Sequence, residues 1–222
     1  MRTPVTRKQL KDHFGYSWWK YVLLAVIVWM GWNITYSVTA YRPPQEKQVV
    51  LGVYSAGSDV NASDYMAQVQ RIHMPDMEQM EAMYILPDQQ YGDLILMTRV
   101  AGNDCDLYVL PTQQFHSWAS QGACQPLEIV VPGLVTDLEC SGISLSRGRR
   151  THEDSGEKHL YGIPCRDLPG ADQMLGFNAD DYYICVFHNT GNDENVLKFL
   201  TIFVYDLMNE PPVTPTDLAP AQ

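Results

Sequence analysis

The residues best placed for binding chemistry in this chain follow two apolar runs that have the pattern of buried strands. The first run is Gln48-Val-Val-Leu-Gly-Val-Tyr54, and the second extends from Cys105 to Leu110. Ligands of open α/β sheets bind outside the carboxyl ends of the strands. The predicted binding site consists of the small and polar residues at these two ends, which are Ser55, Gly57, Ser58, Thr112 and Gln113.

The same residues have a second interpretation, because serine, threonine and glycine also form ordinary turns and helix caps. Thr112 stands directly before the helical pattern of residues 113–120, where its hydroxyl can cap the first turn. Gly122 follows that pattern at a position where helices commonly end. The binding site and the turn-and-cap interpretation both stay open at this point.

A series of methionines could bind a soft metal ion. Met74, Met77, Met80 and Met83 recur at every third residue beside His73, and thioethers are ligands of Cu(I). A three-residue step drifts around a helix that has 3.6 residues per turn, so these sulfur atoms would not converge on one ion. Methionine also packs adaptably in cores and against partners, and we therefore predict no metal site here.

Other candidate chemistry is weaker. His152, Glu153 and His159 could bind zinc, but they lie in and beside a flexible polar loop that offers no further ligand. The chain has no nucleophile elbow, phosphate-binding loop, HExxH motif or dinucleotide glycine fingerprint. Asp106, inside the second strand, is the one unusual carboxylate, and no catalytic partner for it is evident. We predict no catalytic residue, no metal, no cofactor and no enzymatic activity.

An α/β domain must position these residues, because strand and helix patterns alternate from residue 48 to residue 210. Beyond the two strands above, the sequence predicts a short strand at 84–86, a strand at 182–187, an interrupted edge strand within 127–138, and an exposed loop or hairpin tip at 147–158. The predicted helices are 59–71, 76–83, 91–100, 113–120 and 196–208. The predicted fold class is α/β, a single three-layer lobe with a mostly parallel sheet, preceded by one transmembrane helix.

That helix is predicted from an apolar segment before the domain. Residues 21–41 contain no charged side chain, and an apolar helix needs about 20 residues to cross the hydrocarbon core. In lipid the segment must be helical, because only a helix satisfies its own backbone hydrogen bonds. Aromatic residues at both ends have the pattern of interfacial belts: Trp18, Trp19, Tyr21, Tyr36 and Tyr41.

Charge is distributed unevenly around this segment. Residues 1–20 hold five basic side chains against one acid, a net charge of +4; the whole chain carries −11, so the remainder carries −15. Positive charge beside a span stays cytoplasmic, which predicts a single-pass protein with its N-terminus inside and its C-terminal domain outside. A cleaved signal peptide is the alternative, although its apolar core would be only about 7–15 residues long.

The predicted organisation is therefore a series of five parts. They are a cytoplasmic basic segment (1–20), a transmembrane signal anchor (21–41), a proline-rich spacer (42–47), an exported domain (48–210) and a disordered tail (211–222). The charge of −15 argues against a nucleic-acid partner and against a second contact with an anionic membrane surface. The five cysteines all lie in the exported part, in no zinc-binding or CxxC spacing, and predict no particular disulfide.

Four segments in order resemble extracellular solute-binding proteins of ABC importers, of the periplasmic-binding-protein-like type II. They are Leu94 to Leu110, Phe115 to Leu127, Tyr161-Gly-Ile-Pro164, and Tyr183 to Leu200. Members of that family hold a ligand between two lobes, whereas the region from about 128 to 180 has no room here for a full second lobe. The resemblance implies one truncated α/β lobe on a membrane anchor.

These observations predict a membrane-anchored extracytoplasmic binding or interaction module of a bacterial cell envelope. Its expected partners are the lipid bilayer, through residues 21–41, and another envelope protein. The short spacer at 42–47 favours a local, partner-bound role over that of a mobile scavenger. The alternative is a working sugar- or peptide-binding component of an ABC importer.

Overall fold

The computed structural model describes residues 7–39, 41, 43–57, 60–87, 91–153, 156–188 and 191–209, with the backbone alone for residues 7–17 and 60. The chain forms two compact units that divide between residues 42 and 43. The tail predicted to be disordered, 211–222, lies outside the described residues.

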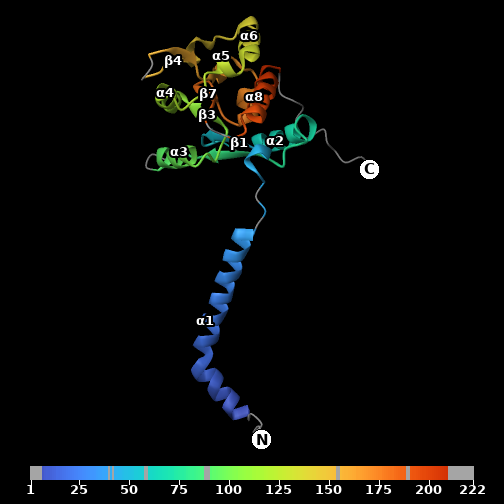
Figure 1. Ribbon diagram of the computed structural model, residues 1–222, viewed down its shortest axis with the longest axis vertical. Coiled ribbons are helices and arrows are strands. Elements are labelled where there is room, and N and C mark those ends of the chain that lie inside the picture. The colour runs from blue at the N-terminus through green and yellow to red at the C-terminus, as the bar shows by residue number, and fades with distance from the viewer. Residues whose placement is uncertain are drawn as a thin grey trace, which may run out of the picture. The chain divides into compact units, whose positions relative to one another are not determined.

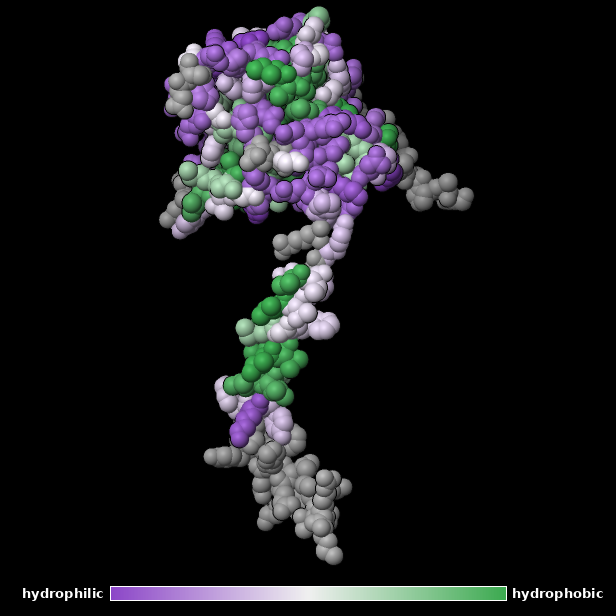
Figure 2. Space-filling model, in the orientation of Figure 1, coloured by the Kyte–Doolittle hydropathy of each residue, from purple (hydrophilic) through white to green (hydrophobic). Residues whose placement is uncertain are grey.

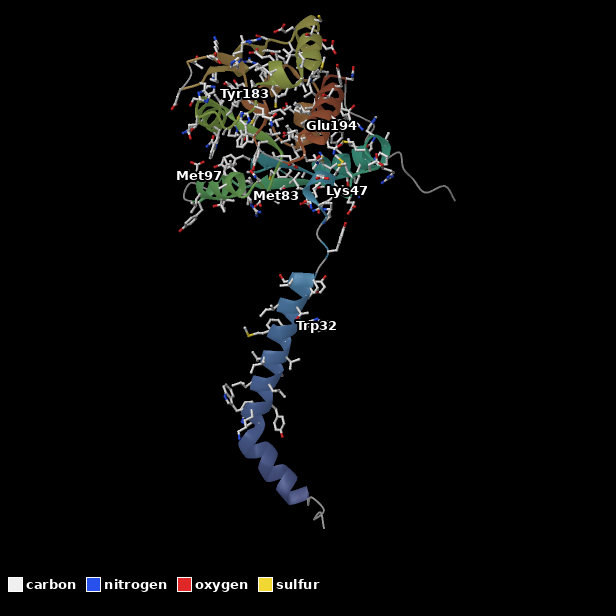
Figure 3. All side chains as sticks on the ribbon, in the orientation of Figure 1. Trp32, Lys47, Met83, Met97, Tyr183 and Glu194 are labelled. Carbon is white, nitrogen blue, oxygen red and sulfur yellow. The ribbon has the colours of Figure 1, made fainter. Side chains whose placement is uncertain are left out.

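The first unit is helix α1 (Arg7–Thr39). Its stretch Trp18–Thr39 is the one helical segment among the described residues that is long and apolar enough to cross a membrane. The large apolar side chains of this stretch are exposed, as Trp32 is at 73% (Figure 3). Figure 2 shows that the domain surface, by contrast, is largely hydrophilic on the side in view.

Polar side chains in the second half of α1 bond to the helix itself. Asn33 Nδ2 donates to the carbonyl of Trp29, and Thr35 and Thr39 donate from their hydroxyls to the carbonyls four residues earlier. Such local bonds lower the cost of placing polar groups in lipid, because water is absent there. The less apolar half of α1 is thereby compatible with a span.

The second unit is built on a five-stranded sheet of order β2-β1-β3-β7-β6 (Figure 1). Its strands are β1 (Gln48–Tyr54), β2 (Gln79–Ile85), β3 (Leu107–Pro111), β6 (Ile163–Pro164) and β7 (Tyr182–Val186). β1 pairs in parallel with β2 and β3, whereas β7 runs antiparallel to β3 and β6. β7 is thus the one of these five strands that runs opposite to the others, and the predicted mostly parallel sheet is confirmed.

Helices cover both faces of the sheet, so the unit has three layers. Figure 1 shows α3 (Gly92–Ala101) and α4 (Thr112–Ser120) on one side of the strands and α2 (Val60–Ile72) and α8 (Asp193–Met208) on the other. The remaining helices are η1 (Gln45–Lys47), α5 (Leu127–Val130), α6 (Pro132–Cys140), η2 (Leu145–Gly148), η3 (Cys165–Asp167) and α7 (Ala171–Leu175).

Alternation along the strands creates two cores of different composition. Val49, Leu51 and Val53 of β1 face a large aliphatic and methionine-containing core beneath α2 and α8. The intervening residues face a smaller core beneath α3 and α4, in which aromatic residues and three cysteines are prominent; it contains Tyr54, Tyr108, Phe115, Tyr183, Phe187, Cys105, Cys124 and Cys185.

Two predicted elements are wrong. The helix predicted at 76–83 is replaced by β2, which pairs with β1 along its whole length, from Gln48↔Gln79 to Tyr54↔Ile85. Met and Glu favour helices by only a few tenths of a kcal/mol per residue, and strand pairing with partial burial overrides that preference. The edge strand predicted within 127–138 is instead the helix pair α5 and α6, in which Pro132 occupies the first turn of α6, where proline is favourable.

The sequence predicts an exposed loop or a hairpin tip at 147–158, and the structure shows a hairpin there. Its strands are β4 (Arg149–Thr151) and β5 (Lys158–Leu160), which pair antiparallel. Residues 154 and 155 lie outside the described residues.

Candidate functional site

The two strand ends that carry the predicted binding site are neighbours in the sheet. The last parallel pair between β1 and β3 is Val53↔Val109, so Ser55 and Thr112 follow it at the same edge, which we call the carboxyl edge. Ser58 lies outside the described residues. Whether this edge binds a ligand stays a prediction. The structure does show which contacts Ser55, Gly57 and Thr112 make.

Ser55 and Gly57 form a tight turn. Ser55 is buried at 4% exposure, and its hydroxyl oxygen accepts a hydrogen bond from the Gly57 amide at 3.2 Å. A Cβ atom on Gly57 would lie 2.6 Å from the ring of Phe177 and 3.3 Å from that of Tyr84. Phe177 therefore packs over the turn, and only glycine allows so close an approach.

Thr112 ties helix α4 to the turn before β7. Its amide and its hydroxyl both donate to the carbonyl of Asp181, each at 2.9 Å. The predicted capping role of Thr112 is wrong, because the residue at the N-cap is Pro111, and Thr112 is already the first residue of the helix. The Thr112 hydroxyl thus donates to the carbonyl of Asp181, which is distant in the sequence, and accepts no hydrogen bond from an amide of its own helix. Gln113 is exposed.

A polar cluster that the sequence did not reveal lies at the same edge. Asp93 Oδ1 accepts hydrogen bonds from the hydroxyl of Tyr54 at 3.0 Å and from the side-chain amide of Gln114 at 3.2 Å. Tyr54 ends β1, Asp93 lies in the first turn of α3, and Gln114 lies in the first turn of α4. The cluster thus joins three elements that are far apart in the chain.

One local feature of the sequence, the pair Gly92-Asp93, is consistent with this cluster. A Cβ atom on Gly92 would lie 2.7 Å from the hydroxyl of Tyr54, so glycine is needed where the helix start meets the strand end. An acidic residue in the first turn of a helix is favourable by itself through the helix dipole. The pair Gly92-Asp93 therefore has an ordinary explanation, and its partners follow only from the tertiary structure.

The weak zinc candidates separate in the structure. His159 Nδ1 bonds to Glu128 Oε1 at 2.6 Å, and Glu153 accepts a bond from the hydroxyl of Ser120 at 2.9 Å. Glu128 also pairs with Arg149 at 2.5 Å. Hydrogen bonds that His159 donates to Glu128 and, with a smaller effect, to Glu157 raise the pKa of His159. The described residues contain no group of three or more His, Cys, Asp or Glu side chains that could hold a metal ion.

The methionine series is part of the core. Met74, Met77 and Met80 are 2%, 8% and 7% exposed and belong to the core beneath α2 and α8. Met83 packs against the other core and is partly buried. Packing, the alternative to metal binding, is confirmed for these four side chains.

Asp106 joins strands β1 and β3 at the opposite end of the sheet. It lies just before β3, its amide donates to the carbonyl of Val50 at 2.9 Å, and its carboxylate accepts from the Val50 amide at 2.8 Å. Burial raises the pKa of Asp106 to about 6, against the opposing effect of the Val50 hydrogen bond. The unusual carboxylate thus has a structural role, as it extends the pairing of the two strands.

All five cysteines are free thiols in the described structure. Cys105, Cys124, Cys165 and Cys185 are buried, whereas Cys140, at the end of α6, is exposed. Burial raises the pKa of Cys105 to about 12. Buried neutral thiols behave as small apolar side chains, so Cys140 is the cysteine best placed to react with a reagent from solution.

Comparison with known proteins finds similarity at the level of structure alone. No protein-family model matches the chain, and no curated protein matches it. Among solved structures, an extracellular solute-binding protein of family 1 from Alicyclobacillus acidocaldarius is 21% identical, with a TM-score of 0.38 over 53% of this chain and 27% of that one.

Two further structures are of the same kind. An ABC substrate-binding protein from Listeria monocytogenes in complex with cycloalternan is 16% identical, with a TM-score of 0.39 over 52% of this chain and 28% of that one. The galacto-N-biose-/lacto-N-biose I-binding protein of the ABC transporter from Bifidobacterium longum is 17% identical, with a TM-score of 0.36 over 55% and 29%. The chain spans less than a third of the length of each of the three structures. These structural neighbours are extracellular solute-binding proteins of ABC transporters, the kind of protein that the sequence resembles.

Proposed function

We propose that this protein is a membrane-anchored extracytoplasmic binding or interaction module that performs no catalysis. The observation that carries the proposal is the exposure of α1, because none of its apolar stretch Trp18–Thr39 is buried against the rest of the chain. An exposed apolar surface of this length needs a cover, and a hydrocarbon layer about 30 Å thick matches 20 or so helical residues.

The charge distribution supports the proposed orientation. The positive segment before the apolar stretch is the kind that stays in the cytoplasm, and the domain after it carries the acidic excess. The domain is then exported, and its link to the span is short, because α1 ends at Thr39 and η1 begins at Gln45. Such a tether favours a partner that is itself held in or at the same membrane.

The polar groups of the carboxyl edge support a role without catalysis. The Asp93 carboxylate accepts hydrogen bonds from Tyr54 and Gln114, and the Thr112 hydroxyl donates to the backbone carbonyl of Asp181. General acid–base and nucleophilic catalysis require side chains that are free to exchange protons or attack, with a matched pKa. Side chains committed to one another in this way hold elements together and leave an exposed surface, in which Gln113 lies, for recognition.

Exposed Cys140 provides a direct test of orientation. Spheroplasts that express the full chain are treated with a membrane-impermeant maleimide, and labelling of the protein is measured before and after lysis. We expect labelling without lysis, and none in a Cys140→Ser variant, because the other four thiols are buried. Labelling that requires lysis would place the domain in the cytoplasm and overturn the proposal.

Anchoring and partnership need two further measurements. The full chain should resist extraction by alkaline carbonate, and a variant with Ile27→Asp and Val28→Asp should be released, because each charge at a helix centre costs about 3 kcal/mol in the membrane. A Leu23→Ala variant is the matched control and should stay bound. Crosslinking in native membranes should then yield one defined complex; a monomer at all crosslinker concentrations would contradict the interaction role.

A second candidate function is that of a small-molecule binder that feeds an importer. The observation that favours it is the proximity of the Ser55 and Thr112 strand ends at one edge, the usual location of ligands in such sheets. Thermal unfolding of the full chain is measured with a panel of sugars and short peptides. A saturable rise in the melting temperature that Gln113→Ala abolishes would favour this function over the first.

A further inference from the structure

Helix α3 presents an apolar face to solvent. Leu94, Ile95 and Met97 of this helix are 60%, 43% and 56% exposed, and Tyr91 just before the helix and Leu86 just after β2 are exposed as well. We call these five side chains the α3 patch. Residues three or four apart are neighbours on a helix surface, so Leu94 has Tyr91 and Met97 beside it. Figure 2 shows a green, apolar area over α3, and Figure 3 labels Met97 on this helix.

The α3 patch itself contains no charged side chain. Thr98 lies on the same side of the helix, and its hydroxyl donates to the carbonyl of Leu94 at 2.8 Å, as the threonines of α1 do to their own helix. The two charged residues of α3 flank this side and are already bonded. Arg99 pairs with Asp104 at 2.9 Å, and Asp93 belongs to the polar cluster of the carboxyl edge. The face is therefore suited to an apolar contact.

The charge of the chain disfavours a second copy of the protein as the occupant of this face. Exposed apolar patches mark contacts with proteins or with membranes. The part of the chain that contains the domain carries the acidic excess, so two copies that meet here would bring two negative domains together, and their charges would repel. Acyl chains and neutral headgroups impose no such cost.

The chain enters the domain beside the strand on which α3 packs. Lys47, at the end of η1, forms an ion pair with Glu78 at 2.7 Å, and Glu78 directly precedes β2. β2 is an edge strand of the sheet, and α3 contacts it. The entry of the chain and the α3 patch therefore both lie at the β2 edge of the domain.

We propose that the α3 patch docks on the lipid surface around the span, with its side chains among neutral headgroups and the upper part of the acyl chains. This inference rests on the proposed anchoring by α1. Because α1 ends at Thr39 and η1 begins at Gln45, the link is short and keeps the domain at a high local concentration beside lipid. A contact that is weak by itself is then sufficient, and an apolar helix face that lies on a membrane enters it by about 5–10 Å.

Docking of this kind depends on apolar burial and not on ionic contacts. High salt should leave it unchanged, because screening acts on charges and the patch has none. Anionic lipids should weaken it, because their negative surface potential repels the acidic domain. These two responses distinguish the α3 patch from a basic, headgroup-binding surface.

The experiment uses the full chain in phosphatidylcholine nanodiscs that hold one chain per disc. In a Cys140→Ser background, Thr98→Cys carries an environment-sensitive fluorophore; the other four native thiols are buried. Half of the samples contain lipids with a nitroxide quencher in the upper part of the acyl chain. We expect a blue-shifted emission of the label and its quenching by these lipids. A label that stays unquenched in discs that contain the chain would overturn the proposal.

Thr136→Cys in α6 provides the matched control position. Thr98 and Thr136 are both exposed, and both donate their hydroxyls to the carbonyl four residues earlier, so labelling removes the same local bond at each. The label at position 136 should stay unquenched, and equal quenching at the two positions would overturn the proposal. A label at position 98 that is shielded from aqueous iodide but not quenched by lipid would show a protein on this face, which also overturns it.

A matched pair of variants tests the contribution of the patch. Leu94→Glu places a charge in the patch and removes the burial of one leucine, so the ratio of docked to free domain should fall about tenfold. Ile129→Glu is the control, because Ile129 is 64% exposed in α5, outside the patch, and it should leave the ratio unchanged. Equal ratios in Leu94→Glu and the parent protein would overturn the proposal.

Flotation of the same chain in phosphatidylcholine vesicles separates this docking from the anchoring. A chain that does not float with the vesicles would overturn the anchoring by α1, and the docking with it. A chain that floats while the label at position 98 remains unquenched would overturn the docking alone.

Discussion

The two ends of the sheet differ in how their polar groups are satisfied. At the carboxyl edge, Tyr54 and Gln114 share Asp93, Thr112 bonds to Asp181, and Ser55 holds Gly57. At the opposite end of the sheet, where β3 begins and β7 ends (the amino edge), the hydroxyl of Tyr108 is buried next to the thiol of Cys105, near a pocket of about 140 Å³. The carboxyl edge, where the sequence predicts a binding site, is thus the edge whose polar groups form more hydrogen bonds.

This difference shows that polar residues near strand ends can be present for different physical reasons. Near turns, the side chains of Ser, Thr, Asp and Gln form hydrogen bonds with the backbone and with one another. These hydrogen bonds are enough to explain why such residues occur there. A buried hydroxyl next to a thiol has only a weak bond, because sulfur is a weak donor and acceptor. The two edges therefore differ in the strength of the hydrogen bonds that their polar groups form.

The largest expected effect concerns Asp106, a charge at the amino edge. Its pKa is raised by burial to about 6, so its contribution to stability is fully present below its ordinary pKa and is lost as the pH rises through 6. The parent protein should lose about 3 kcal/mol from this group between pH 4 and pH 7. An Asp106→Asn variant keeps an acceptor for the Val50 amide and should lack that loss.

Urea unfolding of both proteins in detergent, followed by circular dichroism across this pH range, measures the difference. Parallel pH profiles for the two proteins would show that the pKa of Asp106 is not raised by folding.

At the carboxyl edge, Asp93→Ala should destabilise the domain by about 2 kcal/mol. The change removes the acceptor of two hydrogen bonds, and bonds to a charged acceptor contribute more than neutral ones. Asp93→Asn is the matched control, since it keeps an oxygen acceptor, and it should cost less. Chemical unfolding gives the comparison, and equal losses in the two variants would show that the charge, not the acceptor, matters.

A matched pair of tyrosines tests the contrast directly. Tyr54→Phe removes a hydroxyl that donates to Asp93 and should cost about 1 kcal/mol. Tyr108→Phe removes a buried hydroxyl whose polar neighbour is the thiol of Cys105, a weak hydrogen-bonding group, and should leave the free energy of unfolding unchanged or increase it. Both are measured by urea unfolding without added ligand. A loss in Tyr108→Phe as large as that in Tyr54→Phe would erase the distinction between the two edges.

The smallest effect is expected away from both edges, in the β4–β5 hairpin. The pKa of His159 is raised by its hydrogen bonds with Glu128 and Glu157, so the stabilisation is present below pH 6.5 and disappears as the pH rises through the raised value. His159→Gln should therefore lower the melting temperature slightly at pH 5.5 and not at pH 9. An equal change at both pH values would show that packing, not charge, is lost.

The sequence predicts those elements whose patterns are local. Residues 48–54 are a continuous β-branched run, and they form β1. The helix at 91–100 appears as α3, with Gly102 as its C-cap residue. The sequence predicts a short strand at 84–86 but not the earlier part of β2, because Met and Glu residues there favour a helix locally and the pairing partner β1 lies some thirty positions earlier.

Some features of the candidate site could likewise be predicted from the sequence, and others could not. The position of Ser55 and Thr112 at one edge follows from two strands and the general rule for such sheets. The carboxylate to which Tyr54 and Gln114 bond could not be foreseen, since the cluster depends on how α3 and α4 pack on the sheet. The pocket at the amino edge left no motif in the sequence at all.

The sequence by itself determines that this chain has an apolar helix long enough to span a membrane and an acidic α/β domain after it. Both follow from properties of consecutive residues, namely hydrophobicity, length and charge. Only the tertiary structure decides which polar groups are satisfied. Gly52, Cys105 and Tyr108 meet at one place because β1 and β3 pair there, and the polar neighbour of a buried hydroxyl is known only when its surroundings in space are known.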